Sequence, residues 1–156
     1  MIKFAAFAVA VALFATGQNA PPSIDVPSGA QLLLSAKGEG AQVYTCTGGD
    51  WTLKAPDAKL FDENGKQIGT HFAGPTWKLN DGSEVKGKAI ATQPSPDSGS
   101  VAWLLLQALP ASVSGQFAKV TYIRRTETHG GGAPKEACTS GELSVPYTAQ
   151  YSFYGQ

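Results

Sequence analysis

Short runs of apolar residues alternate with turn residues from about residue 30 to the end of the chain. In the run 84–89, every second residue is charged, which indicates a strand with one buried face, because successive strand side chains point to opposite faces. The run 101–106 is apolar at every position, which predicts a strand covered on both faces, with a short helix as the competing interpretation. Beyond the first 20 residues no helical periodicity is convincing. The pattern predicts an all-β fold, an antiparallel β-sandwich or partly closed β-barrel, with very little helix.

Turn residues divide this pattern into individual strands. Asn64-Gly65 and Asn80-Asp81-Gly82 each lie between apolar runs and predict hairpins, because Asn and Gly tolerate positive φ. A calcium site at Asp62, Glu63 and Asn64 is the weaker interpretation of the first turn. The predicted strands span residues 31–36, 41–47, 51–54, 59–61, 66–72, 76–79, 83–92, 101–108, 117–128 and 145–154.

The N-terminus has the layout of a signal peptide. One lysine, Lys3, precedes an apolar run from Phe4 to Ala15, which is too short to span a bilayer. We expect a signal peptide over residues 1–17, with cleavage after Ala20 as the alternative, then an extended lead-in over 18–29 and one β-domain over 30–156. The predicted location is secreted, either extracellular or periplasmic.

The charge balance argues against two classes of partner. Lysine plus arginine and aspartate plus glutamate each number 12, and no basic run occurs. The sequence therefore predicts no binding to nucleic acid and no membrane insertion after signal cleavage. It leaves the oligomeric state open.

The two cysteines, Cys46 and Cys138, are most simply a disulfide in an exported chain. Such a bond would close a loop of roughly 90 residues and stabilise the fold by about 4–5 kcal/mol in the chain-entropy model. Two separate buried thiols are the alternative.

The residues 68–83 (IGTHFAGPTWKLNDGS) form the most distinctive block of the sequence. Together with 103–106, 120–125 and 145–149, this block resembles a family of secreted bacterial and fungal proteins, the domain-of-unknown-function family 3455. The resemblance runs from about Val26 to Tyr154. It implies export and a β-rich domain, and it implies no known activity.

Known catalytic and metal-binding patterns are absent from the sequence. The chain holds two histidines, His71 and His129, without zinc-ligand spacing, and one methionine, Met1. Gly-x-Ser-x-Gly does not occur, and the carboxylates lie at hairpin tips, where they are normally solvated. We predict no metal, no cofactor and no catalytic residue. Whether the protein is an enzyme stays open, and the missing catalytic patterns favour a protein without enzymatic activity.

One segment remains as a candidate ligand site: His71, Trp77, Asn80 and Asp81. Gly74-Pro75 breaks the strand and could turn His71 towards Trp77, so that a small polar ligand, such as a sugar, could stack and form hydrogen bonds there. The structural alternative places Trp77 in the core and bonds His71 to a backbone carbonyl.

Three functions follow from this site. The first is a non-catalytic module that binds a small ligand or a surface. The second is an extracellular hydrolase with His71 as the base, and the third is a structural or envelope-interaction protein. Arg124 and Arg125 point to opposite faces of a strand, and we expect the inward one to form a structural ion pair, with Glu127 or Asp81 as the carboxylate. An anion anchor is the alternative role of that arginine.

Overall fold

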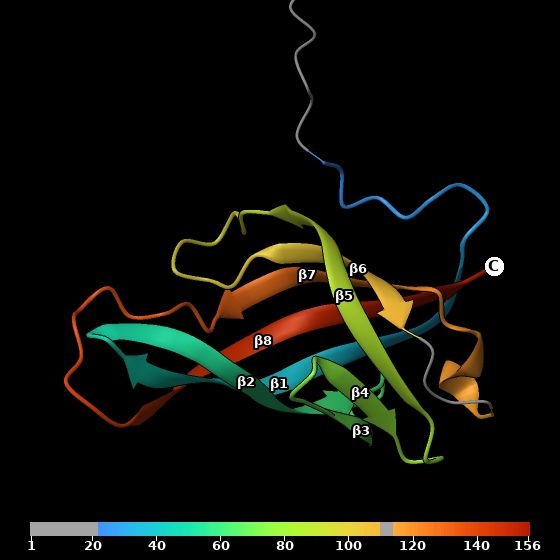
Figure 1. Cartoon of the computed structure of the whole chain (residues 1–156). Helices are drawn as coiled ribbons and strands as arrows, with labels where there is room; N and C mark the ends of the chain where they lie inside the picture. The colour runs from blue at the N-terminus through green and yellow to red at the C-terminus, as the bar shows by residue number, and fades with distance from the viewer. Residues whose placement is uncertain (1–21, 110–113) are drawn as a thin grey trace, which may run out of the picture.

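Eight antiparallel strands form a closed barrel in which each strand pairs with the next along the chain and β8 pairs back onto β1 (Figure 1). The structure is a computed structural model and describes residues 22–109 and 114–156, so the predicted signal peptide lies outside the described residues. The elements are β1 (Gln31–Thr47), β2 (Asp50–Phe61), β3 (Gln67–Phe72), β4 (Thr76–Leu79), β5 (Glu84–Gln93), β6 (Trp103–Leu109), the 3₁₀ helix η1 (Gln116–Lys119), β7 (Tyr122–Gly130) and β8 (Glu142–Gly155). The prediction of an all-β antiparallel fold with very little helix is confirmed. Among the described residues, no helix is long and apolar enough to cross a membrane.

Strand β1 joins the two strands predicted over 31–36 and 41–47. It pairs with β8 on one side and with β2 on the other, which closes the ring. The interior is narrow here, because a Cβ placed on Gly38 would lie 2.5 Å from the Tyr151 ring. Glycine at position 38 therefore lets the Tyr151 ring lie across β1 inside the barrel.

Prediction was wrong at the start of the strand expected over 117–128. Residues 116–119 form η1, and β7 begins only at Tyr122. The backbone N–H groups of Gln116 and Phe117 donate to side chains of Asp81 and Ser83 instead of to a neighbouring strand. This places the buried Phe117 ring across one end of the barrel, against Phe153, with 4.6 Å between ring centroids.

The lead-in covers the outer face of the barrel beside β5 and β6 (Figure 1). Ile24 is 3% exposed and packs with Ala91 and Leu105 in a small cluster outside the main core. Leu106, which follows Leu105 in β6 and points to the opposite face of the sheet, belongs to the main core. Residues 103–106 of the apolar run therefore lie in a strand that is covered on both faces, as the sequence predicts, whereas residues 101 and 102 precede that strand.

A disulfide joins Cys46 to Cys138 at the opposite end from η1, with 5.8 Å between the α-carbons. The Cys138 N–H also donates to the Gly49 carbonyl at the tip of the β1–β2 hairpin. Cys138 lies in the loop between β7 and β8, and at the start of that loop Gly131 pairs with Ser100 in an isolated bridge. The β7–β8 loop is thus fixed to two neighbouring segments.

Candidate functional site

His71 and Trp77 meet inside the barrel as register partners on β3 and β4. The turn at Gly74-Pro75, whose peptide bond is cis, brings the two strands together. The rings stack with centroids 4.3 Å apart and an interplanar angle of 10°. Both side chains are buried, at 2% and 1% exposure. The sequence predicted that they would approach one another, but neither lies at a surface where a sugar could stack.

The His71 ring is neutral and has a defined tautomer. Its Nδ1 lies 2.9 Å from the Thr76 carbonyl, which can only accept, so Nδ1 carries the proton and Nε2 keeps a lone pair. Burial lowers the pKa of His71 to about 4; the hydrogen bond to Thr76 opposes this, and the charge on Arg125 adds to it. His71 is therefore an uncharged acceptor at neutral pH.

Two tyrosines from β8 extend this cluster. Tyr151 lies edge-on to both His71 and Trp77, with centroid distances of 5.1 and 5.5 Å. Its hydroxyl is 3.0 Å from the hydroxyl of Tyr147, which lies four residues earlier on the same face of the strand. Burial is the main cause that raises the pKa of both phenols, so both stay protonated.

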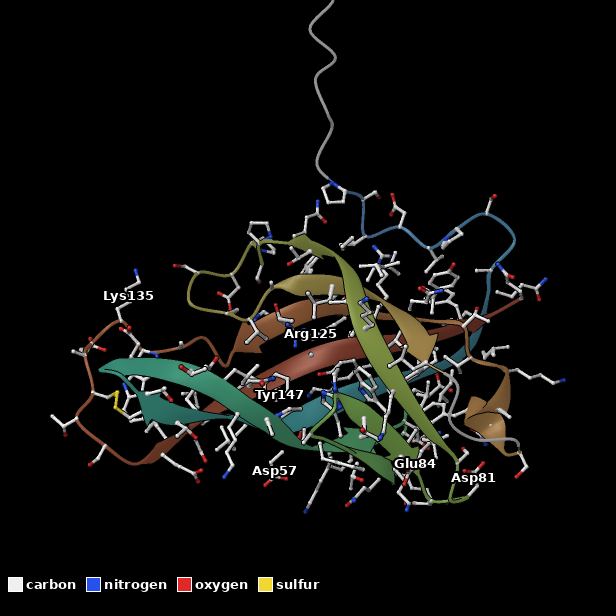
Figure 2. All side chains as sticks on the ribbon, viewed as in Figure 1. Asp57, Asp81, Glu84, Arg125, Lys135 and Tyr147 are labelled. Carbon is white, nitrogen blue, oxygen red and sulfur yellow. A yellow bond between two sulfur atoms is a disulfide. The ribbon has the colours of Figure 1, made fainter. Side chains whose placement is uncertain are left out.

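Arg125 brings a positive charge into the same interior space. It is the register partner of Tyr151 on β7, and Figure 2 shows it together with Tyr147 between the strands of the ring. Its Nε and Nη2 donate to the Ala102 carbonyl at 3.0 and 2.8 Å, and it also forms a hydrogen bond with the Tyr151 hydroxyl. A guanidinium carries five N–H donors, so this carbonyl and hydroxyl do not use all of them.

The expected ion pair of the inward-pointing arginine is wrong. None of the ion pairs among the described residues includes Arg125. Glu127 is exposed, and Asp81 lies at the end of the β4–β5 hairpin, apart from Arg125 in Figure 2. Arg124 points outward, 4.0 Å from Asp25 of the lead-in. The backbone carbonyl of Ala102 therefore stands where a carboxylate was expected.

A cavity of about 30 Å³ lies among these groups. It is lined by His71, Pro75, Trp77, Leu104, Leu106, Arg125 and Tyr151. This volume holds roughly two water molecules. The Trp77 Nε1 has no hydrogen-bond partner among the described residues. The same holds for Gln42 Nε2, Trp103 Nε1 and Arg124 Nε, but of these four residues only Trp77 is among the residues that line the cavity. Buried donors without partners are rare, so each calls for an explanation.

Asn80 and Asp81 do not belong to this interior cluster. Asn80 donates to the Gln67 carbonyl at 3.0 Å. Asp81 accepts from Ser83 Oγ at 2.6 Å and from the Gln116 N–H at 2.9 Å, and the bond from Ser83 is the main cause that lowers its pKa. Asp81 thus anchors η1 across the barrel end. Both residues line a separate surface groove of about 320 Å³ that contains no aromatic side chain.

Within residues 22–109 and 114–156, the groups that an acyl-transfer hydrolase needs are not assembled around His71. Its Nδ1 bonds a carbonyl, where a catalytic triad has a carboxylate. A second cluster joins Ser100, Asp97 and His129, but Asp97 lies between the other two, at 2.6 Å from Ser100 Oγ and 3.1 Å from His129 Nδ1. In a triad the histidine occupies that middle position. Among the described residues, no group of three or more His, Cys, Asp or Glu side chains could hold a metal ion.

Sequence reasoning missed Tyr147 and Tyr151 as members of the site. The alternation of Tyr147, Ala149, Tyr151 and Phe153 does show in the sequence that they share a face. The sequence does not show that this face of the last strand lies opposite Trp77. The one available signal was the inward arginine at position 124 or 125, whose charge requires polar neighbours when it is buried.

Fold and site together define a closed antiparallel β-barrel with a small polar compartment in its interior. The chain belongs to the family described as "Protein of unknown function (DUF3455)", whose model matches residues 27–155. Neither the curated proteins nor the solved structures contain a match to the chain.

Proposed function

We propose that this protein is an exported, non-catalytic module that binds a small polar ligand inside its barrel. The polar groups that line the cavity, His71, Trp77, Arg125 and Tyr151, together with Tyr147, which is hydrogen-bonded to Tyr151, are called the polar half below. The observation that carries the proposal is a guanidinium that faces a cavity without a carboxylate partner among the described residues.

The energetics of burial support this proposal. Removing a charge from water is costly unless the charge is paired, and an unpaired buried hydrogen-bonding group costs about 1–3 kcal/mol. Arg125 binds a neutral carbonyl, and the Trp77 Nε1–H binds nothing in the described part of the chain. An aliphatic side chain at position 125 would avoid this cost. Polar groups that are kept against such a cost are candidates for a functional role.

The dimensions of the cavity limit the ligand. Drug-sized ligands occupy sites of roughly 300–1,000 Å³, whereas this cavity measures about 30 Å³. A sugar therefore does not fit the compartment. The surface groove beside Asn80 and Asp81 is large enough, but Trp77 is buried and offers no ring for stacking there. We therefore propose a ligand of only a few atoms.

Export is part of the proposal. It rests on the signal-peptide layout of residues 1–17 and on the Cys46–Cys138 disulfide, which is typical of oxidising compartments. A role in envelope assembly through a free sheet edge has less support, because each of the eight strands has a hydrogen-bonded neighbour on both sides.

A thermal-shift screen of small polar compounds tests the function, because a ligand that binds only the folded state raises the melting temperature. The screen uses wild type, Arg125→Met and, as a matched control, Arg124→Met. We expect at least one compound to stabilise wild type and Arg124→Met but not Arg125→Met. Equal stabilisation of Arg125→Met, or no stabilising compound at all, would contradict the proposal.

A further inference from the structure

Hydrogen-bond donors outnumber acceptors in the polar half, and this imbalance defines the chemistry of a ligand. We propose that the compartment binds a small monovalent anion, such as a halide, nitrate or formate. This inference rests on the proposed function, because it names the class of ligand for the same cavity. It depends on Arg125, Trp77 and the two tyrosine hydroxyls.

The tyrosine pair leaves one proton without an acceptor. The two hydroxyls of Tyr147 and Tyr151 carry two protons, and the 3.0 Å hydrogen bond between them uses one. Arg125 also donates to Tyr151, so it takes up acceptor capacity and supplies none. Whichever hydroxyl donates within the pair, no further hydrogen bond among the described residues takes up the other proton.

Trp77 supplies a second unused donor. Its side chain is 1% exposed, it lines the cavity, and its Nε1–H has no partner in the described part of the chain. An indole nitrogen donates only, so nothing except an acceptor satisfies it. The stack on His71 holds the indole in one orientation.

The net charge of the compartment is positive. Arg125 keeps its charge, His71 is neutral with a pKa of about 4, and the tyrosines stay protonated. The field of Arg125 reaches Tyr44, His71, Tyr147 and Tyr151, since it acts to lower the pKa of each. The lone pair on His71 Nε2 is a single acceptor against this surplus of donors. A positive, donor-rich and partly desolvated site favours an anion over a neutral ligand.

Size then selects among anions. A volume of about 30 Å³ takes roughly two water molecules, which corresponds to a monatomic ion or an anion of three or four heavy atoms. Gluconate is far too large and serves as a control for general salt effects. Formamide has the size of formate but no charge, so it separates anion recognition from binding of any small polar molecule.

The test measures melting temperature against the concentration of sodium bromide, nitrate or formate, with sodium gluconate holding the ionic strength constant. Wild type and Arg124→Met are expected to show a saturable rise. Arg125→Met should lose it, with an apparent affinity lower by roughly tenfold or more, as for a lost charge-assisted hydrogen bond. An unchanged titration in Arg125→Met would overturn the inference.

Formamide distinguishes this inference from the function on which it rests. If formamide stabilises wild type through Arg125 and the anions do not, the binding function stands and the anion assignment is wrong. If neither formamide nor any anion produces a saturable shift, both are wrong.

A crystal of the wild-type protein soaked in bromide gives a readout that needs no variant. We expect an anomalous peak in the cavity between Arg125 and Trp77. Bromide at surface positions only, with the cavity holding water, would overturn the assignment even where a thermal shift is seen.

Discussion

The barrel interior has two halves that differ in polarity and in how completely their groups are satisfied. The apolar half lies towards η1 and contains Leu60, Leu79, Val85, Phe117, Ile123 and Phe153. These residues form one continuous core cluster with Trp77, Tyr147 and Tyr151 of the polar half and with Leu106, which lines the cavity. The polar half lies one pleat further along the same strands, since Phe153 and Ile123 are register partners, as are Tyr151 and Arg125. The same strands thus build both a core and a compartment with unused donors. Under the proposed function, the first half stabilises the fold and the second half binds the ligand.

The largest expected effect comes from the apolar half. Phe153 is fully buried and contacts the rings of Phe117 and Trp77, so Phe153→Ala removes a large side chain from a packed core. We expect a loss of about 3–5 kcal/mol in the free energy of unfolding, measured by urea denaturation. Phe72→Ala is the matched control, because Phe72 is 38% exposed and should cost far less. Similar losses for both variants would contradict the assignment of this half as the core.

The pH dependence of stability probes the polar half through His71. Its pKa is about 4 in the folded protein and 6.5 in the unfolded chain, so the unfolded state binds the extra proton first. The free energy of unfolding therefore keeps the full contribution of neutral His71 above about pH 6.5, and it falls by about 3 kcal/mol as the pH drops towards 4. The measurement is urea denaturation from pH 4 to pH 7.5.

The two histidines provide the control for this pH effect. His129→Asn should keep the dependence, because His129 is exposed. His71→Phe should flatten the curve between pH 4 and pH 6.5. A curve that stays equally steep in His71→Phe would show that other groups cause it.

A smaller change is expected from Arg125→Met, and this prediction separates the two halves most sharply. Arg125 is half-buried. Replacing such a charge by an apolar side chain of similar length is often close to neutral for stability, because the desolvation cost is removed with the charge. We expect the free energy of unfolding to change by about 1 kcal/mol or less, in urea denaturation at neutral pH. A loss as large as that of Phe153→Ala would mean that Arg125 is there to hold the fold together.

The smallest effect concerns the end of the apolar half. Asp81→Ala removes the acceptor for the Gln116 N–H and for Ser83, which should loosen η1 and leave the rest of the barrel unchanged. Hydrogen exchange should become faster at Gln116 and Phe117 and stay unchanged in β8. Asp57→Ala, at another exposed aspartate, should alter neither region. Unchanged exchange at η1 in Asp81→Ala would contradict the anchoring role.

Local features of the fold were predictable from the sequence because they depend on neighbouring residues. Asn64-Gly65 forms a turn in which Gly65 has a φ of 78°, and the Asp62 side chain accepts from the Asn64 and Lys66 N–H groups. These bonds make the calcium interpretation of that turn unnecessary. The approach of His71 to Trp77 was predictable for the same reason, since only three residues separate their strands.

Features that depend on distant pairing could not be predicted. Closure of the ring requires β1 to pair with β8, and no local pattern specifies that partner. The ring centroids of His71 and Tyr151 lie 5.1 Å apart although 80 positions separate them in sequence, so their contact appears only once the barrel has closed. The sequence placed Asp81 in a ligand site because of the residues next to it. In the structure its carboxylate instead accepts a hydrogen bond from the Gln116 N–H, 35 residues away.

The indole N–H resonances of the three tryptophans test the central claim most directly. In a proton–nitrogen NMR spectrum, Trp51, Trp77 and Trp103 each give one side-chain signal, assigned with single Trp→Phe variants. We expect formate or bromide to shift the Trp77 signal in a saturable way and to leave those of Trp51 and Trp103 in place. A Trp77 signal that stays unchanged, while the others move or nothing moves, would contradict a binding site in the polar half.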